Sequence, residues 1–313
     1  CPIDTVGRVI DGYVANAFLF RDENGDGVFQ ESEASAVSDD QGRFQLGGSP
    51  EAAVVVDPSQ DPLGRIAVDI DTISEDNPDG DAFTGVLKAP AGSSVVTPLT
   101  TLVQQLIEAE PTLSVADAQT TVKSALGITG DDDLTSIDPI EAENVEIYKA
   151  GVQVAGLIAA VGGGEAGLAA TAALADAVKA AEPGSVNLTD ADAVKAVIEV
   201  AKASNSEAFA SVDADAAASA TASKAAAVDE AESIDGVGDV QSATFLVSEA
   251  GGVVSFGGSA TGTIVMTLAD DGGATFSRAG VAGKVSATGD ATTATVVDVA
   301  NKRLMVASIW LLS

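Results

Sequence analysis

The sequence contains no histidine, and this absence limits the chemistry that the protein can perform. Histidine is the usual general base and a common metal ligand in proteins, and the Ser-His and Cys-His nucleophile systems depend on it. The chain also lacks a G-x-S-x-G nucleophile motif and a G-x-x-x-x-G-K-[ST] phosphate loop. Carboxylate pairs could still hydrolyse glycosides, but the aromatic residues that would line a sugar cleft make up only 4% of the chain. We therefore predict that the protein is not an enzyme.

Positively charged residues are scarce: Lys and Arg number 15 against 47 Asp and Glu in 313 residues, a formal net charge of −32. Nucleic acids and anionic membrane surfaces are bound through Lys and Arg, so this balance argues against both as partners. It suits a protein that works in a salty medium, because salt screens the self-repulsion. No apolar run approaches the ~20 residues that cross a bilayer, so no membrane span is predicted.

The chain has one cysteine, Cys1, which excludes a disulfide bond within the chain. Cleavage of a lipoprotein signal leaves a cysteine at the first position, and that cysteine then carries a lipid. One interpretation is therefore a lipid anchor at Cys1. The other is that a boundary of the chain falls at a cysteine by coincidence.

Three stretches of different composition predict an α+β multidomain fold. Residues 1–95 alternate short apolar runs with turns rich in Asp, Gly and Pro, which is typical of an antiparallel β-sandwich. Residues 96–235 change to a helical period and form a predicted helical domain or spacer. Residues 236–313 are again rich in Gly, Thr and Val and predict a C-terminal antiparallel β domain.

Helix signals begin at Thr97 and Pro98, an N-cap followed by proline at the first helical position. The apolar residues after them recur at spacings of three and four, the period of one helix face. Ser114 begins the next predicted helix, which Gly127 ends. Further helices are predicted over residues 139–161, 165–181, 189–203 and 205–233. The last is mostly Ala, Ser, Asp and Glu, so it either packs closely against a neighbour or stays largely solvated as a spacer.

The sharpest local signal is the acidic segment DENGDGVFQESE, residues 22–33, which matches the calcium-loop pattern D-x-[DN]-x-[DN]-G-x5-E at every fixed position. Ca²⁺ is bound by oxygen atoms, and this spacing directs several of them to one ion while a glycine allows the sharp turn. The alternative is a solvated acidic turn, and a strand-like segment rather than an amphipathic helix precedes the loop. The predicted ligands are the side chains of Asp22, Asn24, Asp26 and Glu33 and the main-chain carbonyl group of Val28.

The loop and its flanks, residues 11–20 and 38–44, resemble the calcium-binding B-type repeats of bacterial surface adhesins. Those repeats are prealbumin-like sandwiches related to the carboxypeptidase regulatory domain. Asp39, Gly42 and Phe44 match that family's D-x-x-G-x-F motif, which opens a core strand. A later segment, residues 83–103, resembles the junction at which such a sandwich leads into a helical segment in large exported bacterial surface proteins.

The resemblance covers about residues 7–160 and implies an exported, calcium-stabilised structural or adhesive protein. It carries over no catalytic residue, and only the five loop ligands transfer as site residues. Residues 236–313 resemble no particular family.

A second group of carboxylates lies between residues 69 and 81. Side chains at this density repel one another unless a cation or solvent separates them. The segment is therefore either a second calcium site or a solvated acidic loop. Its members are Asp69, Asp71, Glu75, Asp76, Asp79 and Asp81.

The most apolar stretch of the chain is LMVASIWLL, residues 304–312. One interpretation is an ordinary central strand of the C-terminal β domain. The other is a strand that adds to the sheet of a neighbouring subunit through main-chain hydrogen bonds. A head-to-tail contact of that kind does not close on itself, so it builds a filament or lattice.

Together these features predict an extracellular structural protein of a bacterial cell surface, stabilised by calcium. It is expected to self-assemble as a homopolymer, with strand exchange as one route, into a filament, a sheath or an S-layer-like array. The alternative is a monomeric or lipid-anchored surface adhesin that binds a surface glycan or another cell-surface ligand.

Overall fold

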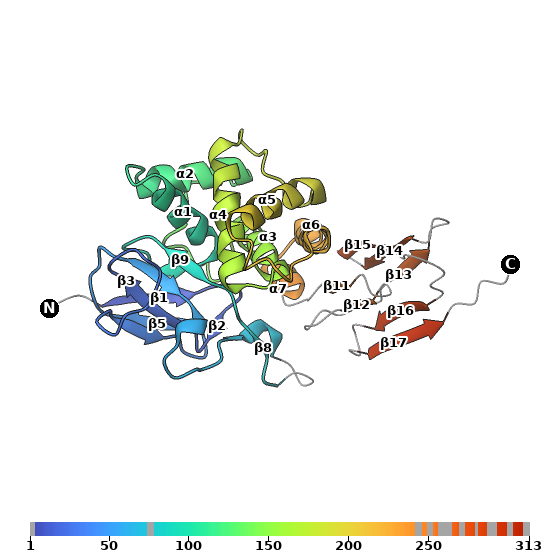
Figure 1. The fold of residues 1–313 in the computed structure, drawn as a ribbon, viewed down its shortest axis with the longest axis horizontal. Coiled ribbons are helices and arrows are strands. Elements are labelled where there is room, and N and C mark those ends of the chain that lie inside the picture. The colour runs from blue at the N-terminus through green and yellow to red at the C-terminus, as the bar shows by residue number, and fades with distance from the viewer. Residues whose placement is uncertain are drawn as a thin grey trace.

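The computed structural model describes residues 4–73 and 78–241, and then individual strands between residues 246 and 308 (Figure 1). Strands come first in the chain and helices follow, so the protein has mixed α and β structure. Cys1, the predicted anchor position, lies outside the described residues. Across the part of the chain that the structure describes, no helix is long and apolar enough to span a membrane.

The N-terminal strands form small sheets joined by short turns. In the described residues up to position 96, the sheet orders are β4-β3-β6-β9, β10-β1-β5 and β2-β7-β8. Neighbouring strands are antiparallel except β1 and β10, which run parallel. The strands are β1 (Thr5–Val9), β2 (Val14–Ala15), β3 (Phe18–Asp22), β4 (Ser35–Val37), β5 (Arg43–Leu46), β6 (Ala53–Val56), β7 (Val68–Asp69), β8 (Asp81–Ala82), β9 (Leu87–Ala89) and β10 (Val95–Val96), with single 3-10 turns η1 (Pro58–Gln60) and η2 (Ile70–Thr72).

The helices follow in an unbroken series, and two of them begin as the sequence predicts. The Thr97 hydroxyl accepts a hydrogen bond from Thr100 N at 3.0 Å, and the Ser114 hydroxyl accepts one from Asp117 N at 3.1 Å. Gly127, with φ of 73°, ends the second helix as predicted. The helices are α1 (Pro98–Ala109), α2 (Val115–Leu126), α3 (Val145–Ala160), α4 (Gly164–Ala180), α5 (Ala191–Ser204), α6 (Ala214–Glu230) and α7 (Ile234–Gln241).

The long helix predicted from Pro139 begins later, at Val145, so that prediction is wrong at its N-terminal end. The Asp138 carboxylate accepts a hydrogen bond from Ile140 N at 3.0 Å and holds the residues after it in a turn. The Asn144 side chain then caps α3, accepting a hydrogen bond from Ile147 N at 3.0 Å.

Two further boundaries differ from the sequence-based expectation. The helix predicted over residues 205–233 is limited to α6, because the turns before it place Phe209 in the core and Asp213 caps the helix, accepting Ala216 N at 2.9 Å. The sequence predicts strand structure from residue 236 onward, and this is wrong at its start, because residues 234–241 form α7. The predicted division between helical and C-terminal parts therefore falls inside a helix.

Strands and helices share one hydrophobic core. Residues from the N-terminal sheets and from every helix between α1 and α6 contribute to the same cluster of buried side chains. The edge strand β9 is joined to α1, because Lys88 N donates to Thr101 Oγ1 at 2.9 Å and Thr100 Oγ1 donates to Lys88 O at 2.8 Å. The change from strands to helices near residue 95 thus occurs within continuous packing. Fully buried members of the core include Leu19, Leu87, Leu102, Leu157 and Leu174.

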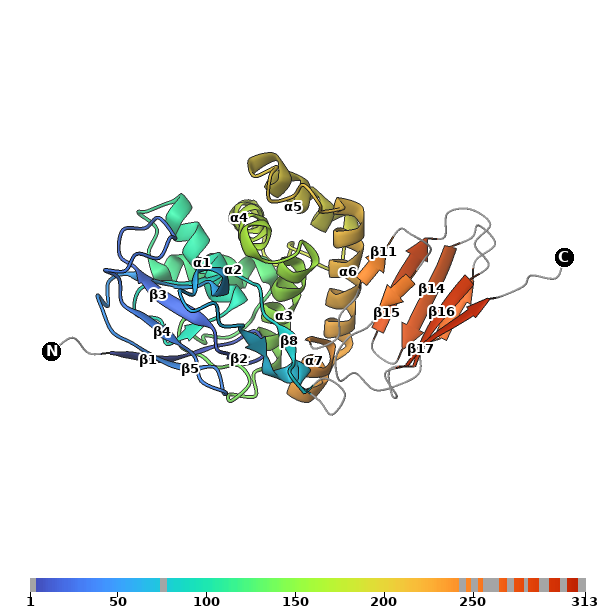
Figure 2. The same cartoon turned by 60° about the horizontal axis from the view of Figure 1, so that its bottom comes forward.

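The alanine-rich helix α6 packs closely against α3 and α5 (Figure 2). Of the two alternatives for this segment, close packing is therefore the observed one. Because its side chains are small, the axis of α6 can approach those of α3 and α5 closely. The alanine side chains are therefore buried although each is short. The buried residues of α6 are Ala214, Ala217, Ala218, Ala220, Thr221, Ala222, Ala225, Ala227 and Val228.

The C-terminal strands pair in an antiparallel manner, within β11-β12, β13-β14-β15 and β16-β17. Within the predicted terminal run, β17 pairs with β16 of its own chain, from Arg303 opposite Asp298 to Ser308 opposite Thr293. Residues 309–313 lie outside the described part, and exchange of this strand between subunits stays a prediction. The strands are β11 (Leu246–Ser248), β12 (Val253–Ser255), β13 (Val265–Leu268), β14 (Gly273–Arg278), β15 (Val281–Ser286), β16 (Thr293–Asp298) and β17 (Arg303–Ser308).

Candidate metal centre

The acidic loop connects β3 to β4 and is anchored at both ends and in its middle. Asp22, its first residue, and Glu33, its last, are 6% and 7% exposed, which is unusual for carboxylates. Between them the Phe29 ring packs edge-on against Phe18, with centroids 5.0 Å apart, and lies 5.6 Å from the Phe20 ring. The loop therefore covers a hydrophobic cluster on the face of the β3 sheet away from the main core.

Asp22 is bound by the main chain of its own loop. Its Oδ1 accepts hydrogen bonds from Gly25 N at 2.8 Å and Asp26 N at 3.1 Å, and its Oδ2 accepts one from Gly27 N at 3.0 Å. Gly25 and Gly27 have φ of 75° and 70°, the left-handed region in which glycine is favoured. Burial raises the pKa of Asp22 above its ordinary value, although these N–H donors and the charge of Lys88 oppose the shift.

Glu33 closes the loop by binding its two halves. Its Oε1 accepts a hydrogen bond from Glu23 N at 2.9 Å, and its Oε2 accepts one from Gln30 N at 3.0 Å. The last predicted ligand is therefore fixed next to the first. The hydrogen bonds of the loop itself therefore hold both Asp22 and Glu33 in place.

The two middle ligands are turned toward amide groups. Asn24 Oδ1 accepts a hydrogen bond from Asp26 N at 3.0 Å, and Asp26 Oδ1 accepts one from Val28 N at 2.8 Å. The Gln30 amide donates to both oxygens of Asp26, at 3.3 and 3.1 Å. The Val28 N–H bond and these side-chain donors lower the pKa of the exposed Asp26.

Gln60, from η1, holds the second half of the loop and was not identified from the sequence. Its Nε2 donates to Gly27 O at 2.9 Å, and its Oε1 accepts a hydrogen bond from Phe29 N at 2.7 Å. These two bonds fix the peptide groups on either side of Val28. Among the described residues, none donates a hydrogen bond to the Val28 carbonyl oxygen, which leaves this predicted ligand open.

The loop has the donor atoms for a hard cation but does not gather them at one point. Within the described residues, no three acidic side chains are placed to hold a metal ion together. The reason is local, because Asp26 and Asn24 face amide donors instead of Asp22 and Glu33. The donor set is all oxygen, its two end carboxylates are fixed and the Val28 carbonyl is open, which fits Ca²⁺. Binding would require Asp26 and Asn24 to exchange those amide donors for the ion.

A groove of about 620 Å³ lies beside the loop, between the β3 sheet and helices α1 and α4. Its lining combines apolar side chains with charged ones, of which more are acidic than basic. Among the lining residues, Lys88 Nζ lies 3.0 Å from both carboxylate oxygens of Glu108. Lining residues include Asp26, Val28, Val86, Glu108, Glu165 and Leu168.

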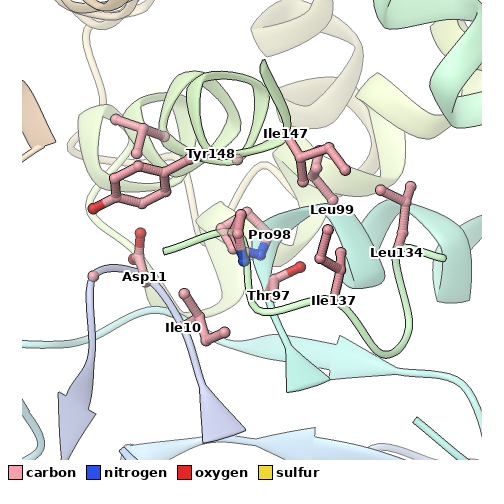
Figure 3. Close-up of a pocket in the computed structure, with 13 residues that line it drawn as sticks. Ile10, Asp11, Thr97, Pro98, Leu99, Leu134, Ile137, Ile147 and Tyr148 are labelled. Atoms are coloured by element: carbon pink, nitrogen blue, oxygen red, sulfur yellow. The ribbon is translucent and has the colours of Figure 1, made fainter. Parts of the chain in front are cut away.

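A second group of ionisable side chains lies between the strands, α3 and α6. Figure 3 shows the Asp11 carboxyl group and the Tyr148 hydroxyl group at one end of a small pocket. Burial raises the pKa of Asp11 to about 6, with a further rise from Asp71 and an opposing effect of Lys224. Burial also raises the pKa of Tyr148 and lowers that of Lys224.

Lys224 reaches this group by crossing α3 at Gly156. A Cβ atom at Gly156 would lie 3.3 Å from Lys224 Cδ, closer than nearly all such contacts, so glycine makes room for the lysine stem. The charges of Asp11 and Asp69 favour the protonated form of Lys224 there. Of the second predicted acidic group, the structure thus places Asp69 near Lys224 and Asp71 near Asp11. Asp79 and Asp81 are exposed, and residues 75 and 76 lie outside the described part.

Asp11→Asn is expected to flatten the pH dependence of stability between pH 4 and pH 7. The folded-state pKa of Asp11, about 6, is above its ordinary value of 3.8. The stabilisation from binding this proton is complete below about pH 4 and is lost as the pH rises through about 6, a change of about 2–3 kcal/mol. Thermal unfolding across this range would measure it, with Asp40→Asn on an exposed turn as the matched control. Parallel pH profiles for wild type and Asp11→Asn would contradict the assignment.

In the D-x-x-G-x-F segment a tight turn leads into β5. Asp39 Oδ1 accepts hydrogen bonds from Gln41 N at 2.9 Å and Arg43 N at 2.8 Å, which forms the turn before β5. Gly42 has φ of 71°, and a Cβ there would lie 2.7 Å from Val9 O. Phe44 is buried in the core.

Membership of the adhesin repeat family stays a prediction. Compared with family models, with curated proteins and with solved structures, the chain has no match in any of the three.

Proposed function

We propose that the protein is an extracellular structural protein of a bacterial cell surface, stabilised by calcium in the loop of residues 22–33. Copies of the chain assemble into a filament, a sheath or an S-layer-like array. In this proposal the N-terminal strands form the calcium-bearing β-sandwich, the helices join it to a C-terminal antiparallel β domain, and the protein has no catalytic role.

The observation that carries the proposal is the way the loop is built into the sheet. Asp22 and Glu33 are buried, and Phe29 packs on the ring of Phe18. An ion that joins the two ends of this loop would hold β3, β4 and Phe29 together, so binding energy in the loop becomes stability of the sheet. Stiffening of that kind suits a subunit that bears load in a polymer.

Charge gives calcium a second role in assembly. Each chain carries a formal net charge of −32, so copies repel one another when they are brought together. Divalent cations reduce that repulsion both by binding and by screening. Calcium-dependent association is therefore expected to exceed what the same ionic strength of NaCl produces.

The groove beside the loop supports a second candidate function. A hollow of about 620 Å³ lined by both apolar and polar side chains has the size of a ligand site. It favours the alternative of a monomeric or lipid-anchored adhesin that binds a surface glycan or another cell-surface ligand. The two candidates differ in the size of the particle that the purified protein forms.

Particle mass and shape, measured with calcium and then with a chelator, test the proposal. Light scattering and negative-stain microscopy are expected to show polymers in calcium that loosen or disappear on chelation. NaCl at matched ionic strength is the control for screening. A compact monomer of ~31 kDa under every condition would contradict assembly and favour the adhesin.

A further inference from the structure

The ammonium group of Lys88 lies directly beside the acidic loop of residues 22–33, the cation loop. Lys88 is on the edge strand β9, and its side chain is only 9% exposed. A Cβ atom added to Gly27, at the turn of the loop, would be 4.0 Å from Lys88 Nζ. The charge of Lys88 also acts on Asp22, the first predicted ligand. A fixed positive charge thus lies next to a loop whose chemistry suits a divalent cation.

Lys88 is held in this place from both ends. Its main chain is bound to Thr100 and Thr101 of α1, and its Nζ lies 3.0 Å from both carboxylate oxygens of Glu108 on the same helix. Gln104 Nε2 also donates to Glu108 Oε1, at 3.0 Å, which fixes the carboxylate. Because both partners are anchored, Lys88 cannot swing far from the loop when an ion enters.

The Lys88–Glu108 pair places two opposed charges of unequal burial at the loop, because the Lys88 side chain is 9% exposed and that of Glu108 is 37% exposed. The buried charge, on Lys88, repels a divalent ion and acts on Asp22, whereas solvent screens the attraction of the more exposed Glu108. Partial burial of Lys88 limits the screening of this repulsion by solvent. Such a pair weakens binding without removing any ligand.

We propose that the Lys88–Glu108 pair regulates the cation loop by lowering its calcium affinity. The loop then fills only at the high calcium concentrations at which extracellular modules work. Bound calcium in turn presses Lys88 toward Glu108 and tightens the contact between the β3 sheet and α1. This inference rests on the proposed function, since it concerns the regulation of the same loop.

Calcium titration of the full chain by isothermal calorimetry tests the proposal with variants of opposite expected sign. Lys88→Met keeps an unbranched apolar side chain without the charge and is expected to tighten calcium binding about tenfold. Glu108→Gln leaves Lys88 unopposed and is expected to weaken binding several-fold. The matched controls are Lys179→Met and Glu110→Gln, because Lys179 and Glu110 form a separate exposed ion pair at 2.7 Å. Both controls are expected to bind as the wild type does.

The outcomes separate this inference from the function on which it rests. A wild-type chain that does not bind calcium overturns the proposed function. Wild-type binding that Glu33→Gln abolishes, with unchanged affinity in both Lys88→Met and Glu108→Gln, overturns only the charge regulation. If circular dichroism shows that Lys88→Met is misfolded, the calcium affinity of Glu108→Gln tests the regulation alone. Weaker binding supports it, and unchanged or tighter binding overturns it. The gain in Lys88→Met is also expected to shrink as NaCl is raised, because the repulsion that it removes is screened.

Discussion

Replacing Leu102 with alanine is expected to lower the free energy of unfolding by about 2–5 kcal/mol, and to loosen strands and helices together. Leu102 is fully buried on α1, in the cluster that joins the N-terminal sheets to the helices. The smaller side chain leaves a cavity that neighbours from both parts line. Denaturant unfolding would give the loss of free energy, and hydrogen exchange followed by mass spectrometry would show where protection falls.

The matched control for Leu102 is Val200→Ala, because Val200 is 55% exposed on α5. Its expected change is within about 0.5 kcal/mol. In Leu102→Ala, hydrogen exchange should become faster in β9, α1 and α4. One common free energy of opening should describe all three elements. Helices that keep their full protection while the strands lose theirs would show that the two parts unfold independently.

Glu33→Gln is expected to abolish the calcium-dependent gain in stability. For a wild-type chain with free calcium at one hundred times the dissociation constant, that gain is about 2.7 kcal/mol. Glutamine supplies one carbonyl oxygen and no charge, so the loop loses its bidentate ligand. It still offers one acceptor oxygen, so it keeps one of the two hydrogen bonds that Glu33 accepts, from Glu23 N or from Gln30 N. Thermal unfolding in calcium and in chelator would measure the difference.

Glu31→Gln is the control for Glu33→Gln, because Glu31 lies in the same loop but is exposed and is not a predicted ligand. It removes the same charge from the chain. Glu31→Gln should therefore retain nearly the whole gain in melting temperature on adding calcium. An equal gain in Glu33→Gln would place any bound calcium elsewhere.

The sequence was most informative where a short segment determines its own conformation. Thr97 with Pro98 and Ser114 with Gly127 mark helix ends that the structure places within one residue of the prediction. Pro139 carried the same kind of signal, but it lies in a turn held by Asp138, which competes locally with the helix. The end of the helical part was missed because glycines near residue 236 suggested strands and turns, although the residues there form α7.

The candidate site, too, could be predicted from the sequence only where the signal lies within one short segment. Its five predicted ligands could be found because a fixed spacing within one loop relates them. Gln60 and Lys88 could not, because their positions beside the loop depend on how β6 and β9 pair in the sheet. The sequence also does not show that Asp26 turns toward the Gln30 amide. Donor atoms can be listed from a pattern, but their directions follow from tertiary packing.

The close approach of Lys224 to Gly156 couples the stability of two helices, α3 and α6. Glycine within a helix costs about 1 kcal/mol relative to alanine, so α3 gives up stability at this residue. What it gains is a passage for the Lys224 stem, which a Cβ at residue 156 would meet at 3.3 Å. Alanine at 156 becomes favourable once residue 224 no longer needs that passage. The two residues are therefore energetically coupled, and the free-energy effect of a substitution at one position depends on the residue at the other.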